Sequence, residues 1–250
     1  MRAELVKIND HVTLINDNGE STAYVIEGTR GALVVDTVNG EEDLLEVVRW
    51  ITDKPLTVFN THGHGDHVSG NVFFASAYLN HNDWRMYEAN FQSEAAQKAM
   101  EAMGVRPCPV LDISDGDVID IGGLTFQAIE TPGHTRGCVC LLCPEDRILY
   151  TGDAVLAPIW MQLEHSTSIR ELHDSLMKLK ARRGEFDSVL TGHGKKLDDA
   201  ELFDSLLTGV EELLEGKTEN DVEYRWGRGN VCLAHIYAGG REIAYVKEKL

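Results

Sequence analysis

One short stretch of the chain concentrates side chains that bind metal ions. Residues 59–71 read FNTHGHGDHVSGN, in which three histidines and one aspartate fall within six positions. Imidazole and carboxylate groups are the usual protein ligands of zinc and similar divalent cations. The intervening glycines allow unusual backbone angles, which we expect to let neighbouring side chains converge on one ion. The candidate ligands in this stretch are His62, His64, Asp66 and His67.

Three more candidate ligands stand in similar contexts. The segment TPGHT contains His134, LYTGD contains Asp153 and LTGHG contains His193. Each follows an expected strand and lies beside a glycine, and functional side chains of α/β proteins collect in such loops after strands. The alternative is that these are unrelated surface or core residues. Seven potential ligands in four matching loops favour a metal site instead.

Alternating and periodic patterns predict the elements that position these loops. Short segments rich in β-branched residues predict strands over 11–17, 21–28, 31–37 and 55–61, the last of which leads into the histidine loop. An apolar periodicity after an acidic start predicts a helix over 40–53, and a longer helix is expected over 82–104, capped by Asn82 or Asp83 and ended by Gly104.

The second half repeats the order of strands followed by helices. Two strand pairs are expected over 115–135 and 137–156, a strand over 187–194 and closing β structure over 230–250. Helices are expected over 166–184, where Ser168 and Glu171 form a capping box, and over 198–216. Because no repeat, low-complexity tract or linker interrupts the chain, residues 1–250 are predicted to form a single domain.

Composition narrows the classes of partner. The 250 residues carry a formal net charge of −18, which argues against nucleic acid or an anionic membrane surface and leaves a small-molecule substrate as the expected partner. No apolar run approaches the length of a membrane span, and the first residues lack an apolar signal core. Together with an odd number of cysteines, five, this predicts reduced thiols and a cytoplasmic location. The oligomeric state is left open.

The order of these motifs resembles the metallo-β-lactamase superfamily, in which His-x-His-x-Asp-His is followed by a later His, Asp and His. The resemblance covers nearly the whole chain. It implies an α/β fold, a four-layer αβ/βα sandwich of two mixed β-sheets flanked by helices, with the metals at one edge. It also implies two ligand sets that share Asp153: His62, His64 and His134 for one metal, and Asp66, His67 and His193 for the other.

The implied reaction is hydrolysis at a dinuclear metal centre. Two divalent ions, expected to be zinc with iron or manganese as alternatives, lower the pKa of a shared water, so that a metal-bridging hydroxide is the expected nucleophile. Asp66 is then also a candidate catalytic residue that orients this hydroxide.

The motifs are similar to those of more than one branch of the superfamily. Hydroxyacylglutathione hydrolases (glyoxalase II) are similar in THxHxDHxxGN and TPGHTxG, and lactonases are similar too, although they carry a tyrosine where this chain has Leu156. A small ester, thioester or lactone is the expected substrate. A mono-iron dioxygenase on the same fold, a phosphodiesterase and a weak β-lactamase are the alternatives.

The segment 154–165 is expected to contact substrate. It follows the bridging aspartate and contains bulky apolar groups but no lysine or arginine, which favours an uncharged acyl or aryl group over glutathione. The candidate substrate-binding residues are Trp160, Met161 and His165, and packing in the core is the alternative for Trp160 and Met161.

Overall fold

A seven-stranded sheet carries the loop with the histidine cluster. In the computed structural model, which describes residues 3–227 and 229–250, its strands are adjacent in chain order: β1 (Glu4–Lys7), β2 (Val12–Asp17), β3 (Ser21–Glu27), β4 (Ala32–Val35), β5 (Leu56–Phe59), β6 (Ala77–Tyr78) and β7 (Val110–Leu111). Pairing is antiparallel up to β4 and parallel from β4 to β7. Helix α1 (Leu44–Ile51), capped by Asp43, connects β4 to β5.

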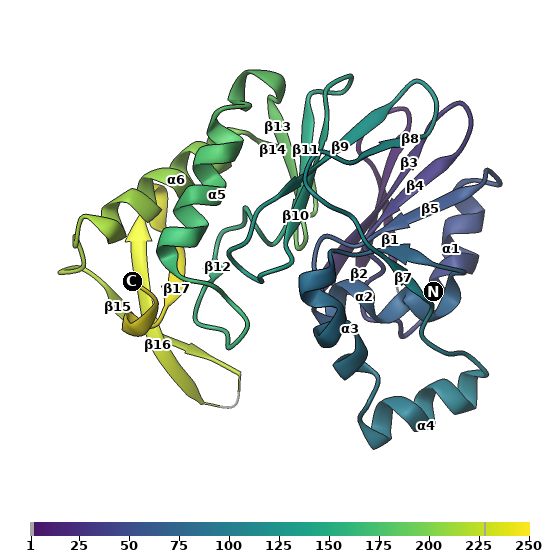
Figure 1. The fold of residues 1–250 in the computed structure, drawn as a ribbon, viewed down its shortest axis with the longest axis horizontal. Coiled ribbons are helices and arrows are strands. Elements are labelled where there is room, and N and C mark those ends of the chain that lie inside the picture. The colour runs from purple at the N-terminus through teal and green to yellow at the C-terminus, as the bar shows by residue number, and fades with distance from the viewer. Residues whose placement is uncertain (1–2, 228) are drawn as a thin grey trace.

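A six-stranded mixed sheet carries the other candidate ligands. Its strand order is β14 (Asp198–Asp199), β13 (Ser188–Thr191), β11 (Ile148–Gly152), β10 (Val139–Cys143), β9 (Thr125–Glu130) and β8 (Val118–Asp120). The outer face of this sheet is covered by α5 (Ile169–Lys180) and α6 (Glu201–Leu214) (Figure 1). The predicted capping box of Ser168 and Glu171 begins α5.

Period-two alternation explains the layers. Along β10, Val139, Leu141 and Cys143 point into a core shared with the N-terminal sheet. Cys140 and Leu142 point the other way, toward α5 and α6. A third core lies between the N-terminal sheet and α1. A strand buried on both faces reads as a continuous apolar run, as VCLLC does here. The result is helix, sheet, sheet, helix, which is the expected four-layer order.

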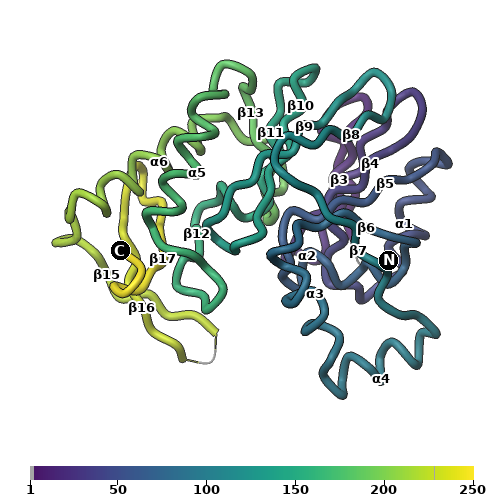
Figure 2. The backbone as a smooth tube through the Cα atoms, viewed as in Figure 1, coloured from purple at the N-terminus to yellow at the C-terminus, as the bar shows by residue number. Residues whose placement is uncertain are grey.

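The C-terminal residues form a third sheet that was not expected as a separate unit. Its four strands are ordered β12 (Ile159–Trp160), β17 (Arg241–Tyr245), β16 (Asn230–Tyr237) and β15 (Val222–Trp226). It therefore joins part of the segment 154–165, which follows the candidate bridging aspartate, to the last strands of the chain. In the tube view the yellow C-terminal segments lie beside the green β12 segment (Figure 2).

The single helix expected over 82–104 is wrong, because the structure has two. Helix α3 (Trp84–Asn90) buries Tyr87, whereas α4 (Glu94–Met103) buries no residue. Ser93 begins α4 by accepting a hydrogen bond from the Ala96 N–H, so a new helix start replaces the continuous helix. Gly104 does end α4, in the left-handed conformation.

Short helical turns complete the described part of the chain. They are the helix α2 (Gly65–Val68) and the 3₁₀ turns η1 (Ser69–Phe73), η2 (His81–Asp83), η3 (Arg183–Glu185), η4 (Ala238–Gly240) and η5 (Lys247–Lys249). Among the residues described, no helix is both long and apolar enough to span a membrane. All five cysteines are buried free thiols.

Candidate metal centre

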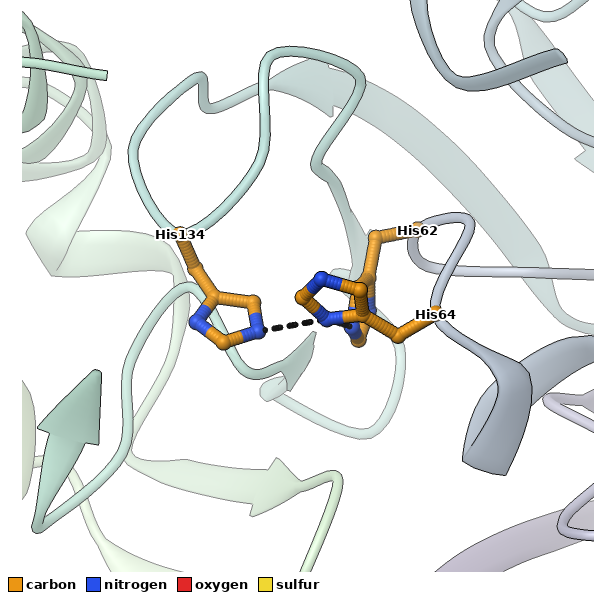
Figure 3. Close-up of side chains that lie close together, drawn as sticks. All are labelled: His62, His64 and His134. Atoms are coloured by element: carbon orange, nitrogen blue, oxygen red, sulfur yellow. Dashed lines mark hydrogen bonds between the residues drawn. The ribbon is translucent and has the colours of Figure 1, made fainter. Parts of the chain in front are cut away.

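Three histidines from two facing loops converge at the edge of the sheets. His62 and His64 follow β5, and His134 follows β9 on the neighbouring sheet. His64 Nδ1 lies 3.0 Å from His62 Nε2 and 2.9 Å from His134 Nε2. Figure 3 shows the three rings pointing toward one another. Their nitrogens are close enough to hold one ion in common.

A second group lies directly beside the first. Asp66 Oδ2 is 3.4 Å from His67 Nε2 and 3.6 Å from His193 Nε2. Helix α2 presents Asp66 and His67 as consecutive residues, and His193 comes from the loop after β13. These three side chains form another possible ion site.

Asp153 lies between the two groups. Its Oδ2 is 3.5 Å from His134 Nε2 and 3.1 Å from His193 Nε2, and its Oδ1 is 3.6 Å from His67 Nε2. It therefore reaches a member of each triad, which is the placement that the sequence resemblance implied for a bridging carboxylate. The structure brings all seven candidate ligands together, while their role as ligands remains a prediction.

The donor set fits divalent cations. Within the described residues, His67 Nε2 and Asp153 Oδ1 are buried without a hydrogen-bond partner, and such orphaned polar atoms are costly unless something binds them. Two ligands that each lie 2.0–2.1 Å from a tetrahedral zinc ion are about 3.4 Å apart. The separations of 2.9–3.6 Å between these donor atoms match that value.

Burial keeps the first three histidines neutral. Desolvation lowers the pKa of His64 to about 3, and it also lowers the pKa values of His62 and His134. A neutral imidazole has a free lone pair, which is the form that binds a metal. Burial opposes ionisation of Asp66, but the neighbouring His67 and His193 together lower the pKa of Asp66 to about 2. The first triad thus offers neutral imidazoles, whereas neighbouring carboxylates outweigh burial and raise the pKa values of His67 and His193.

Protein oxygens hold the outer nitrogens of the histidine rings. His134 Nδ1 lies 3.0 Å from the Trp160 carbonyl, His62 Nδ1 lies 3.1 Å from Thr61 Oγ1, and His193 Nδ1 contacts the Glu20 carbonyl. Such contacts fix the orientation of each ring and leave Nε2 facing the centre of the cluster.

Asp36 is a supporting residue that the sequence analysis missed. It directly follows β4 and is almost fully buried. Its Oδ2 lies 2.9 Å from His67 Nδ1, and its two oxygens accept hydrogen bonds from the Thr61 N–H and hydroxyl at 2.7 and 2.8 Å. The available signal was an aspartate at a strand end, in LVVDT, like the aspartate in LYTGD.

Asp83 was expected only as a candidate helix cap, but it ties the two histidine loops together. Its carboxylate accepts hydrogen bonds from the Gly63 N–H at 2.8 Å, the Thr135 hydroxyl at 2.6 Å and the Gly137 N–H at 2.9 Å. No sequence signal pointed to this role, because Asp83 lies 20 residues from one loop and about 50 from the other.

The reason expected for the glycines in the histidine loop is wrong. Neither Gly63 nor Gly65 has a positive φ angle. A Cβ atom added to Gly63 would instead lie 2.9 Å from the Cβ of Asp83, and one added to Gly137 would lie 2.5 Å from its Cγ. The close approach of the backbone to Asp83 therefore requires glycine at these positions.

A cavity of about 500 Å³ opens over the cluster. It is bordered by candidate ligands from both groups and by side chains from the C-terminal part of the chain, namely Trp160, Gln162, Leu163, Tyr224 and Trp226. Trp160 thus lies where the sequence analysis expected it. Tyr224 and Trp226 were missed, although the alternation in VEYRW places both aromatic rings on one side of a strand.

The other two expected substrate contacts lie elsewhere. Met161 is fully buried in the core against α5 and α6, because the alternation of the extended chain turns it away from the cavity. We therefore correct its placement from the pocket wall to the core. His165 is exposed and borders a second cavity of about 620 Å³, which shares His64 with the first cavity and is also lined by Arg85 and Arg136.

Comparison with known proteins assigns the family. The family model described as the metallo-beta-lactamase superfamily matches residues 16–193, which is more than half of the chain. The chain belongs to the metallo-beta-lactamase superfamily. The predicted membership is confirmed, and so is the predicted fold class, since solved metallo-beta-lactamases share the fold. The crystal structure of DIM-1 metallo-beta-lactamase is 20% identical with a TM-score of 0.64, covering 85% of this chain and 99% of that one.

Other relatives are more similar in sequence than DIM-1 but cover a smaller part of this chain. TTHA1623, solved in a di-iron-bound form, is 26% identical with a TM-score of 0.56, covering 73% of this chain and 91% of that one. A hydroxyacylglutathione hydrolase from Francisella tularensis subsp. novicida (strain U112) is 25% identical over 175 residues, 68% of this chain and 62% of the relative. An atrochrysone carboxyl ACP thioesterase from Pseudocercospora fijiensis (strain CIRAD86) is 26% identical over 140 residues, 54% of this chain and 37% of the relative. The chain spans about half the length of the curated relatives it matches.

Proposed function

We propose that this protein is a hydrolase that binds two divalent metal ions and cleaves a small ester, thioester or lactone. The observation that carries this proposal is the joining of two ligand triads by Asp153 at the floor of one cavity. Bound divalent cations would supply an activated water and would polarise the carbonyl oxygen of the substrate. The proposed ligands are His62, His64, His134, Asp66, His67, His193 and Asp153.

The chain's own residues would orient the reactants. Asp66 borders the cavity, and about a third of its side chain is exposed, so its ionised carboxylate can accept a hydrogen bond from an attacking water. Asp36 and the backbone carbonyls hold the histidine rings in place. Positioning of this kind lowers the barrier because the reacting groups need not be ordered at the moment of reaction.

The residues that border the cavity favour a substrate with an uncharged acyl group. Among the described residues that border it, none is a lysine or arginine, and several are large and apolar. The names of two relatives, a thioesterase and a hydroxyacylglutathione hydrolase, favour a thioester as the first substrate to test. Arg85 and Arg136 border the second cavity, so an anionic thiol is to be tested as well. The cytoplasmic location and the single domain remain predictions.

A substrate panel with metal analysis tests this proposal. The purified protein is assayed on acyl thioesters of a neutral thiol, of glutathione and of coenzyme A, and on lactones, aryl esters, phosphodiesters and β-lactams. We expect the highest kcat/KM on a carboxylic thioester, ester or lactone, and two equivalents of metal per chain. Activity on phosphodiesters alone would contradict the proposal in favour of a phosphodiesterase, and oxygen consumption with a single iron per chain would contradict it in favour of a mono-iron dioxygenase.

A further inference from the structure

One face of the C-terminal sheet is directed at the cavity. In its register, Trp160 on β12 pairs with Ala244, Ala244 pairs with Ala234, and Ala234 pairs with Val222 on β15. Paired residues of neighbouring strands point to the same face, and so does Tyr224, which is two residues after Val222. The opposite face is taken up by Ile159 and Ile243, which pack into the core with α5 and α6.

Small residues in the middle of this face allow side chains from the two edge strands, β12 and β15, to contact each other above it. Ala234 and Ala244 are fully buried and have short side chains. Over them, Trp160 Nε1 donates a hydrogen bond of 2.9 Å to the Tyr224 hydroxyl. The indole and the phenol therefore form one continuous aromatic surface, although they come from opposite edges of the sheet.

This aromatic surface continues to the candidate metal ligands. The ring of Trp160 packs edge-on against the ring of His193, with 5.4 Å between their centroids. At the other end, Trp226 lies two residues after Tyr224 on β15 and also borders the cavity. Trp160 and Trp226 are only partly buried, so ring surface remains for a ligand.

We infer that Tyr224 and Trp226 determine specificity by binding the acyl group of the substrate, and that a flat aryl group is preferred over a small alkyl group. This inference rests on the proposed function. Aromatic rings gain energy from contact with other rings beyond the burial of apolar area, whereas an acetyl group has no ring to make this contact. Tyr224 and Trp226 lie beyond residues 16–193, so this part of the aromatic surface is outside the region that matches the family model.

Paired thioesters of a single neutral thiol test the preference. The phenylacetyl and acetyl thioesters of N-acetylcysteamine differ only in the acyl group. For Trp226→Leu and Tyr224→Leu we expect the ratio of kcat/KM on phenylacetyl to kcat/KM on acetyl thioester to fall about tenfold, within the range for apolar pocket contacts. Tyr224→Phe keeps the ring and should retain most of the ratio.

A matched control is available on the far side of the molecule. Trp50 on α1 is 55% exposed, and Trp50→Leu should leave the ratio unchanged. Equal losses on both thioesters in Trp226→Leu would overturn the inference, because the residue would then not contact the acyl group. An equal effect of Tyr224→Phe and Tyr224→Leu would also overturn it, since the hydroxyl and not the ring would then matter.

A binding measurement tests this inference separately from the proposed function. If the wild-type protein hydrolyses neither thioester, the proposed thioesterase activity fails, and equilibrium dialysis of the metal-loaded protein with phenylacetate and with acetate decides the inference alone. We expect phenylacetate to bind about tenfold more tightly than acetate, and Trp226→Leu to remove this difference. Equal affinity of the wild-type protein for the two acids would overturn it.

Discussion

Replacing Asp83 should loosen both the fold and the metal centre. The residue is 1% exposed, and its carboxylate accepts three hydrogen bonds that join the loop of His62 and His64 to the loop of His134. A hydrogen bond to a charged group contributes about 1.5–3 kcal/mol, and a buried donor left without a partner costs about 1–3 kcal/mol. Because water can enter the space left by Asp83→Ala, we expect a loss of about 4 kcal/mol in the free energy of unfolding.

The effect on metal binding should be larger than a general loss of stability explains. The Gly63 N–H that Asp83 holds lies between His62 and His64 in the chain, so its release lets two candidate ligands move apart. Removing a group that orients ligands weakens metal affinity about 10–100-fold. Asp83→Asn keeps one oxygen acceptor and is expected to lose about half as much stability as Asp83→Ala.

Urea unfolding and chelator competition measure these two effects. Unfolding is followed with and without saturating zinc, and metal affinity is measured against a chromophoric chelator below the unfolding transition. Asp174→Ala is the matched control, because the Asp174 side chain is 75% exposed and its loss should change stability by less than about 0.5 kcal/mol. If Asp83→Ala matches this control in both measurements, the reasoning about the shared anchor is refuted.

Three further predictions concern the centre itself. Elemental analysis should find two metal ions per chain at saturation, and full activity with one ion would refute the two-site assignment. Asp66→Asn should lower kcat about a hundredfold or more at equal metal content, as for other essential site groups, and turnover at the wild-type rate would refute its role. Asp36→Ala should weaken metal affinity about 10–100-fold by releasing the His67 ring, and chelator competition showing the wild-type affinity would refute the support proposed for that ring.

The sequence alone was enough to choose the candidate ligands and most of the elements around them. The cluster at residues 62–67 and the three later motifs each follow a strand, and strand ends in an α/β fold gather at one edge. The capping box of Ser168 and Glu171 is equally local, since both of its partners lie within one helical turn. Where the deciding interaction spans a few residues, its pattern is visible in the chain.

Only the tertiary structure decided which residues support and surround the centre. Asp83 reaches loops 20 and about 50 residues away, so no local pattern marks it. Residues 159–161 read as one apolar group, yet β12 has only two residues, too few for alternation to show that Trp160 faces the cavity and Met161 the core. Tyr224 lies 64 residues from Trp160 and meets it only because β15 and β12 are the two edges of one sheet. Contacts of this length depend on how strands are ordered and registered, and that order is set by the packing of the whole chain.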